Sequence, residues 1–219
     1  QKKGKKSDEP AQTEASWEDK HYELHRGAFN RAVGYADFNT AISSIYYMLE
    51  LKPENIALKD TLALLFFNSG QYGQALLVGE EVLANNPTQE QVLEIVASSE
   101  QSLGMPKEAL KHYETLYGLT EDIYHLYKIG TLQFSLKRFG ECSATLEKII
   151  NAPDTQTQVN ISTEAGSENV PVKAAAYNMR GAMALQLNQV DAAIMNFQQA
   201  LQIHPQFKLA SANLQATKQ

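Results

Sequence analysis

Apolar side chains recur three and four positions apart through most of the chain, in segments separated by glycine, asparagine or proline. Leu62, Leu65 and Phe66 share one helical face, and the pattern is interrupted before it resumes at Leu76. Such spacing is typical of amphipathic helices, and no alternating pattern of comparable length competes with it. The equivalent interruptions carry Gly70, Gly104 and Asn188. Glycine and asparagine readily take the left-handed backbone that ends a helix. The sequence therefore predicts pairs of helices joined by tight turns.

The helical pairs repeat with a period of 34 residues. Pro53 and Pro87 are one period apart, and each lies 12 residues after a small side chain. That small side chain marks every unit, at Ala41, Ala75, Ala109, Cys142 and Ala193. The last interval is 51 residues, which is 17 more than the period. The sequence thus predicts repeats near 22–55, 56–89, 90–122, 123–154 and 174–205, with an insertion within 151–171.

These units resemble the tetratricopeptide repeat, in which a small residue stands at position 20 and a large one at position 24. Position 24 is Tyr113, Leu146 and Phe197 in the last three units, whereas Gly79 departs from the pattern. The resemblance implies an all-α fold, an α-α superhelix (solenoid) of about five helix-turn-helix repeats with a C-terminal capping helix over 206–217. It also implies a concave groove, lined by the first helices, that binds a peptide or protein segment. The sequence contains no phosphate-cradling glycine motif and no spaced set of cysteines or histidines, so we expect no cofactor.

The insertion is polar and interrupts the array. Gln156 to Ile161 alternates in a way that allows a small hairpin. Long loops in compact arrays are functional or disordered, and we expect this segment to be mainly a mobile flap on one edge.

Charge separates the N-terminus from the rest of the chain. Residues 1–6 contain four lysines and no acid, and the remainder has 15 basic against 25 acidic residues. Such an acidic body disfavours nucleic acid as a partner. We expect residues 1–15 to form a disordered basic tail. The sequence starts at Gln1, which suggests export to a bacterial periplasm or envelope after signal cleavage, with the cytoplasm as the alternative. No apolar run is long enough for a transmembrane segment.

The groove positions of the repeat provide the candidate binding residues. They are Arg26, Asn30, Asp60, Leu64, Phe67, Glu94, Tyr124, Tyr127, Phe134 and Asn178. Aromatic residues are concentrated in the fourth unit, where they can stack on a partner or pack against neighbouring helices. Asp60 and Glu94 favour a basic or neutral peptide.

Catalytic alternatives have little support in the sequence. His21 and His25 share a helical face, as two metal ligands would, so a metal-dependent enzyme is one alternative. No third ligand is evident, and Cys142 fits a small buried side chain better than a reactive thiol. A homo-oligomeric structural protein is another alternative. The preferred hypothesis is a non-catalytic interaction scaffold without metal or cofactor, serving as an assembly factor.

Overall fold

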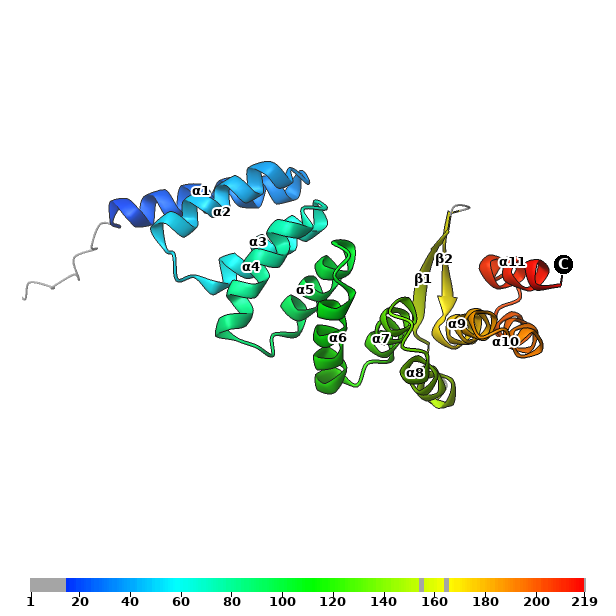
Figure 1. Cartoon of the computed structure of the whole chain (residues 1–219). Coiled ribbons are helices and arrows are strands. Elements are labelled where there is room, and N and C mark those ends of the chain that lie inside the picture. The colour runs from blue at the N-terminus through cyan, green and yellow to red at the C-terminus, as the bar shows by residue number, and fades with distance from the viewer. Residues whose placement is uncertain (1–14, 154–155, 164–165, 219) are drawn as a thin grey trace, which may run out of the picture.

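The structure, a computed structural model, describes residues 15–153, 156–163 and 166–218. Within these ranges the helices are α1 Trp17–Gly34, α2 Phe38–Leu51, α3 Ile56–Asn68, α4 Tyr72–Asn85, α5 Glu90–Ser102, α6 Pro106–Thr120, α7 Ile123–Ser135, α8 Phe139–Asn151, α9 Val172–Gln186, α10 Val190–Ile203 and α11 Lys208–Thr217. Strands β1 Gln158–Thr163 and β2 Gly166–Pro171 lie between α8 and α9. Figure 1 shows the helix pairs following one another in a curved row, with α11 at its C-terminal end. The predicted solenoid is confirmed, and none of the described helices combines the length and apolarity needed to cross a bilayer.

Each helix pair turns at a residue with a left-handed backbone, always at the fifteenth position of its unit. These residues are Ala36, Gly70, Gly104, Lys137 and Asn188. The chain then closes the turn with backbone hydrogen bonds, such as Gln71 N to Phe66 O at 2.8 Å and Met105 N to Glu100 O at 2.9 Å. These bonds satisfy carbonyl groups that the end of a helix leaves without partners.

Small residues let the two helices of a unit approach closely. All five position-20 side chains are fully buried. In the fifth unit a Cβ atom on Gly181 would lie 2.5 Å from Cε1 of Phe197, a separation that real Cβ atoms essentially never show. Gly79 has the same role between units, since a Cβ atom there would lie 2.5 Å from Cγ2 of Val96 on α5. Gly79 therefore departs from the repeat pattern because Val96 of the next unit occupies the space that a larger side chain at position 24 would need.

The insertion forms an antiparallel hairpin in which Val159 pairs with Val170. Both valines are buried in the main apolar cluster. Val172 N donates a hydrogen bond to Thr157 O at 3.0 Å, which joins the hairpin to the start of α9. The allowed hairpin is thus confirmed, and the expectation of a mobile flap is wrong for residues 156–163 and 166–171, because two buried side chains anchor them.

The two ends of the solenoid differ. At the C-terminus α11 covers the fifth unit with Phe207 and Ala210, both fully buried, as expected for a capping helix. At the N-terminus α1 begins before position 22, because Ser16 caps the helix and accepts a hydrogen bond from Asp19 N at 3.1 Å. The expected disordered tail, 1–15, lies outside the described residues except for its last position.

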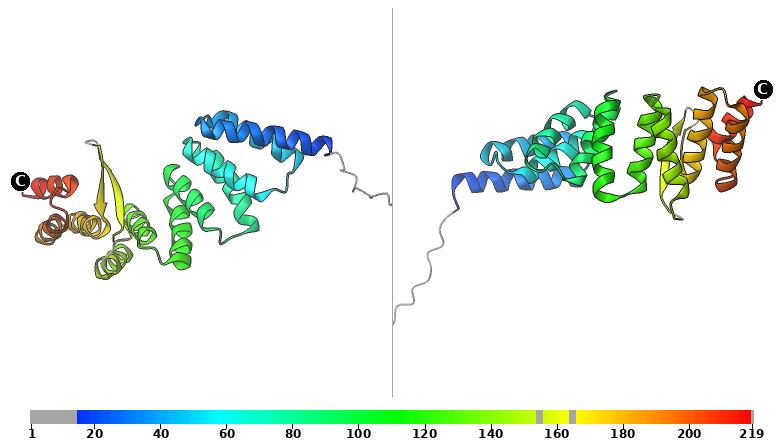
Figure 2. Two further views of the ribbon diagram at one scale, coloured as in Figure 1. Left: turned by 180° about the vertical axis from the view of Figure 1, so that it is seen from behind. Right: turned by 60° about the horizontal axis from the view of Figure 1, so that its bottom comes forward.

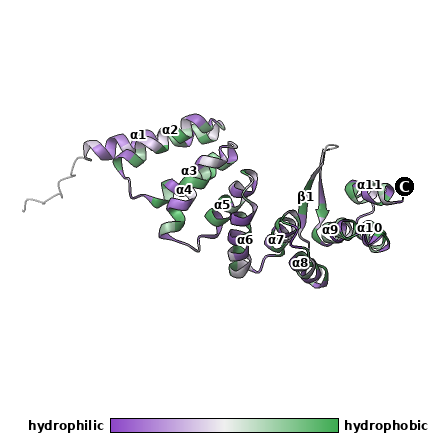
Figure 3. Ribbon diagram, in the orientation of Figure 1, coloured by the Kyte–Doolittle hydropathy of each residue, from purple (hydrophilic) through white to green (hydrophobic). Residues whose placement is uncertain are grey.

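Figure 2 shows the same curved row from two other sides, and Figure 3 shows that the helices carry both hydrophobic and hydrophilic residues.

Candidate functional site

A cavity of about 490 Å³ lies between α5, α7 and the hairpin. Figure 1 shows the hairpin rising between α7 and α9, with β1 on the α7 side. The lining residues are Gln101, Tyr124, Tyr127, Lys128, Thr131, Gln158, Val159, Asn160, Ile161, Ser162 and Asn169. We call this space the hairpin cavity. Its volume falls within the range of small-molecule pockets in proteins.

Two of the predicted groove aromatics meet in the hairpin cavity. Tyr127 is 8% exposed, and Tyr124 is half-buried on the same face of α7. Burial raises the pKa of both phenols, and nearby Glu94 raises that of Tyr124 further. Both hydroxyl groups therefore stay protonated near neutral pH and can donate hydrogen bonds. A rigid ring with a polar tip provides contact area with little loss of conformational entropy.

Lys128 is the charged member of the lining. Its Nζ atom lies 5.5 Å from the ring centroid of Tyr113 and 5.9 Å from that of Tyr124. Desolvation lowers the pKa of Lys128, and the carboxylate of Glu94 opposes that shift. Among the described residues no carboxylate lies within 4.0 Å of this amino group. A half-buried cation without an ion-pair partner favours binding of an anionic group.

Side-chain amides surround the aromatic pair and the cation. They come from Gln101 on α5 and from Gln158, Asn160 and Asn169 on the hairpin, and Asn160 Nδ2 donates to Asn169 Oδ1 at 3.1 Å. An amide side chain offers two donors and one acceptor oxygen, which matches the groups of a peptide backbone. The sequence reasoning missed Lys128 and the hairpin residues as site residues. The alternation of polar and apolar residues from Gln156 onward was the signal that could have identified the hairpin residues of the site.

Four of the predicted groove residues are polar or charged side chains of the first three units, and none of these four lines the hairpin cavity. Arg26 forms an ion pair with Glu23, and Asn30 is exposed further along α1. Asp60 accepts a hydrogen bond of 2.6 Å from Gln89 Nε2, while its Oδ1 atom is buried without a partner among the described residues. Glu94 is exposed on α5.

The other predicted groove residues contribute to packing. Leu64 and Phe67 are partly buried against the core of the first two units. Phe134 packs against Phe139, with ring centroids 6.0 Å apart, and does not line the hairpin cavity. Asn178 is buried and accepts a 2.9 Å hydrogen bond from Asn213 of α11. Side chains already engaged inside the protein are less available to a partner.

The catalytic alternatives gain no support from the described residues. His21 Nδ1 lies 2.9 Å from Trp17 O, and the ring of His25 stacks on Tyr47 with centroids 4.6 Å apart. No group of three or more His, Cys, Asp or Glu residues suited to a metal ion occurs in the described part of the chain. Burial raises the pKa of Cys142 to about 11, which keeps the thiol protonated near neutral pH. A protonated thiol is a poor nucleophile and a poor metal ligand.

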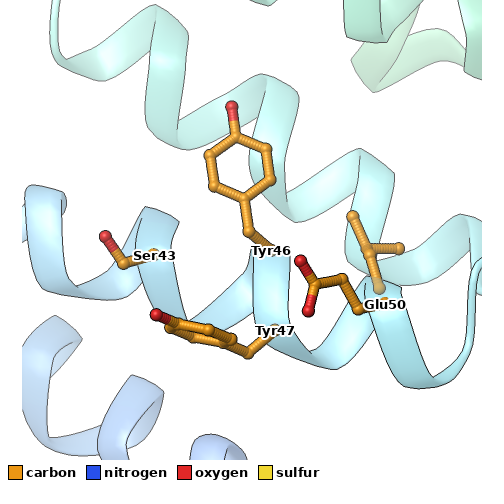
Figure 4. A pocket seen from close by; sticks show the side chains of 5 residues that line it. Ser43, Tyr46, Tyr47 and Glu50 are labelled. Carbon is orange, nitrogen blue, oxygen red and sulfur yellow. The ribbon is translucent and has the colours of Figure 1, made fainter.

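A second cavity, of about 580 Å³, lies over α2. It is lined by Ser43, Tyr46, Tyr47, Leu49 and Glu50, all from one helix. Figure 4 shows the side chains of Ser43, Tyr46, Tyr47 and Glu50 extending from α2. Tyr46 is 49% exposed and Tyr47 is 52% exposed. Because one helix alone supplies the lining residues, this cavity is open and does not enclose a ligand.

Comparisons with known proteins agree with this architecture. The family model described as tetratricopeptide repeat matches residues 174–207, the fifth helix pair. No curated protein matches the chain significantly. The solved structure of YrrB, described as "a TPR protein with an unusual peptide-binding site", is 16% identical with a TM-score of 0.71, covering 93% of this chain and 99% of YrrB. MamA protein is 16% identical with a TM-score of 0.68, covering 85% and 93% respectively. MamA 41-end from Desulfovibrio magneticus RS-1 is 12% identical with a TM-score of 0.67, covering 86% and 97%.

Proposed function

Because the chain is a tetratricopeptide-repeat solenoid, we propose that it is a non-catalytic interaction module that binds a peptide segment of a partner protein in its concave groove. The observation that carries this proposal is the hairpin cavity, where Tyr124 and Tyr127 of α7 face the amides of β1. The solved structure of YrrB, with its peptide-binding site, gives the fold a precedent for this use.

The composition of the hairpin cavity suits a peptide. Tyrosine rings contact apolar side chains, and the amides of Gln101 and Asn160 can exchange hydrogen bonds with peptide groups. The fourth unit is also well packed, since Leu132 and Leu146 are almost fully buried. A site on a rigid element loses little entropy when the ligand binds.

The test uses ten-residue random peptides displayed on phage and selected for binding to the full chain. Affinities of the selected synthetic peptides are measured by fluorescence anisotropy for the parent and for Tyr124→Ala. Loss of a central tyrosine contact should weaken binding by about tenfold or more. Phe134→Ala is the matched control, because it truncates an aromatic residue of the same helix outside the cavity. Equal affinity for Tyr124→Ala and the parent, or a selection that yields no binder, would contradict the proposal.

Homo-oligomerisation is the second candidate, and the exposed aromatic surface of the first unit favours it. Tyr46 and Tyr47 on α2 are about half exposed, and Trp17 and Tyr35 on α1 are more exposed still. Tyr46 and Tyr47 line the same cavity over α2, and exposed apolar patches often mark protein contacts. Light scattering across a concentration series tests self-association, and a monomer whose mass does not change with concentration would contradict it.

We also propose a bacterial envelope as the setting, with the module acting in the assembly of a larger complex. Fractionation of native cells tests this setting directly. Recovery of the protein only with cytoplasmic markers would contradict it, whereas the groove proposal does not depend on the compartment.

A further inference from the structure

The hairpin cavity runs along the outer edge of β1. All five consecutive residues from Gln158 to Ser162 line the cavity, whereas Asn169 is the one lining residue from the described part of β2. A cavity against a face of the hairpin would be lined by alternate residues of both strands, because successive side chains point to opposite faces. The observed lining therefore places the cavity beside the edge of β1, opposite Tyr124 and Tyr127 of α7.

The backbone groups at this edge follow from the pairing register. Gln158 pairs with Pro171, so Thr157 stands opposite Val172, and Val172 N donates to Thr157 O. In an antiparallel pair, bonded and non-bonded residue pairs alternate. The backbone groups of Gln158, Asn160 and Ser162 consequently point away from β2, towards the cavity. An edge with outward N–H and C=O groups is a template for another strand.

The opposite side of the hairpin is held in place. The carboxylate of Glu168 on β2 accepts hydrogen bonds from the backbone of α11, at 3.1 Å from Lys208 N and 3.5 Å from Leu209 N. Val159 and Val170 fix the base of the hairpin in the core. The edge of β1 is thus pre-organised, which lowers the entropic cost of adding a strand.

Charge indicates what such a strand should carry. Lys128 is the one charged residue among the described lining residues, and it has no carboxylate partner among them. Asp60 and Glu94, on which the sequence-based expectation of a basic or neutral peptide rested, do not line the cavity. An acidic side chain beside Lys128 would gain a charge-assisted hydrogen bond in a partly desolvated site.

We propose that an extended segment of a partner protein adds to the outer edge of β1 as a third strand and places an acidic side chain at Lys128. The inference rests on the proposed peptide-binding function and specifies its geometry. Five residues of β1 line the edge, which corresponds to about 17 Å of extended chain. Main-chain hydrogen bonds then provide affinity, while Lys128 and the two tyrosines select the side chains.

A matched pair of proline variants tests the role of the strand edge. Ser162 and Ser167 are directly opposite each other, and their hydroxyl groups are 2.9 Å apart. Ser162→Pro removes an outward N–H on the cavity side, and Ser167→Pro removes one on the far side. Both variants lose this hydrogen bond, and Ser162→Pro also loses the longer one of 3.4 Å from Ser162 Oγ to Asn160 Oδ1. Hydrogen exchange at Val159 and Val170 reports whether each hairpin stays formed.

The selected peptides that depend on Tyr124 serve as probes. We expect Ser162→Pro to weaken their binding by about tenfold, and Ser167→Pro to leave it unchanged, because an unsatisfied peptide carbonyl group is costly in a partly buried site. Equal affinity for both variants, with the hairpin intact, would overturn strand addition and leave the groove proposal standing. If neither variant keeps its hairpin, N-methylation of the peptide decides, since it leaves the protein unaltered.

Methylating the peptide at one backbone nitrogen at a time should reduce affinity at alternate residues only, because every second N–H of an added strand faces β1. A loss at every position, or at none, would overturn strand addition. The selected peptides should share an acidic residue, and Lys128→Met should weaken them by about tenfold while exposed Lys111→Met does not. Peptides without a shared acidic residue, or insensitive to Lys128→Met, would overturn the assignment of the acidic side chain.

A second copy of this chain is the competing occupant of the edge. A dimer detected by light scattering that Ser162→Pro abolishes and Ser167→Pro preserves would overturn the partner-peptide assignment in favour of edge-to-edge pairing. A selection without any Tyr124-dependent peptide would overturn both this inference and the proposed function.

Discussion

Replacement of Gly181 by alanine tests whether close approach of the paired helices holds the solenoid together. The new Cβ atom would lie 2.5, 2.7 and 2.9 Å from three ring atoms of Phe197, whose side chain is fully buried. Relief requires a shift of about 1 Å in a packed ring, and overpacking of this kind costs about 1 to 3 kcal/mol. Alanine in place of glycine regains about 1 kcal/mol of helix propensity. Gly181→Ala should therefore destabilise the fifth unit by up to about 2 kcal/mol.

Gly130 provides the matched control, because it occupies the same position in the fourth unit. There the nearest atoms to an added Cβ are Cγ2 of Thr145 at 3.5 Å and Cδ2 of Leu146 at 3.6 Å, which is ordinary contact. Gly130→Ala should therefore be neutral or stabilising by up to about 1 kcal/mol. The two variants differ in the space around one methyl group, and a difference of about 1 to 3 kcal/mol is expected between them.

The assay is urea unfolding followed by circular dichroism, together with hydrogen exchange. Repeat arrays can unfold unit by unit, so exchange of the amides in α9 and α10 reports the stability of the fifth unit itself. Combining Gly181→Ala with Phe197→Leu removes two of the three clashing atoms and should show favourable coupling of about 1 kcal/mol or more. A Gly181→Ala protein as stable as Gly130→Ala would refute the reasoning.

Three further predictions concern one turn, the contact of a buried carboxylate with a histidine, and the thiol. Lys137 has a φ of 57° at a turn where Gly104 has 74°, so Lys137→Gly should stabilise the chain by up to about 1 kcal/mol in urea unfolding. The Glu100 carboxylate is 3% exposed and lies 2.7 Å from His112 Nδ1, so His112→Ala should cost about 3 kcal/mol in the same assay. Cys142, with its pKa raised to about 11, should resist a thiol reagent at pH 8 until urea unfolds the chain, and stability should fall as pH rises from 9 towards 11.

Each of these outcomes has a result that contradicts it. A loss of stability in Lys137→Gly would show that the turn does not strain lysine. Replacing Glu100 and His112 together by leucine should recover most of the loss, and no recovery would mean that the pair itself is not responsible. The sign for Cys142 follows from its raised pKa: above pH 9 the unfolded thiol loses its proton before the folded one, which favours unfolding. Rapid labelling of the folded protein would contradict its burial.

The repeating pattern of small and large residues determined the helix pairs and their number, and the resemblance to the repeat family implied the closing helix. Ala41, Ala75 and Cys142 are small because two backbones cross there, so local sequence spacing carries the information. The sequence predicted only some of the turn residues. Gly70 marks its turn by type, whereas Ala36 and Lys137 adopt the same left-handed backbone without such a mark, because the flanking helices impose it.

The tertiary structure decided which groove positions are available to a partner. The 34-residue period places Tyr127, Phe134 and Asn178 on the groove-facing side of the first helices of their units, but the surroundings of these side chains differ. Phe134 packs on Phe139 and Asn178 bonds to Asn213, while Tyr127 faces the hairpin. A period describes contacts between neighbouring units, and these contacts are the same for every repeat. The insertion and the capping helix do not follow the period. Only the tertiary structure therefore determined that the fourth unit faces β1 across a cavity and that α11 covers the fifth unit.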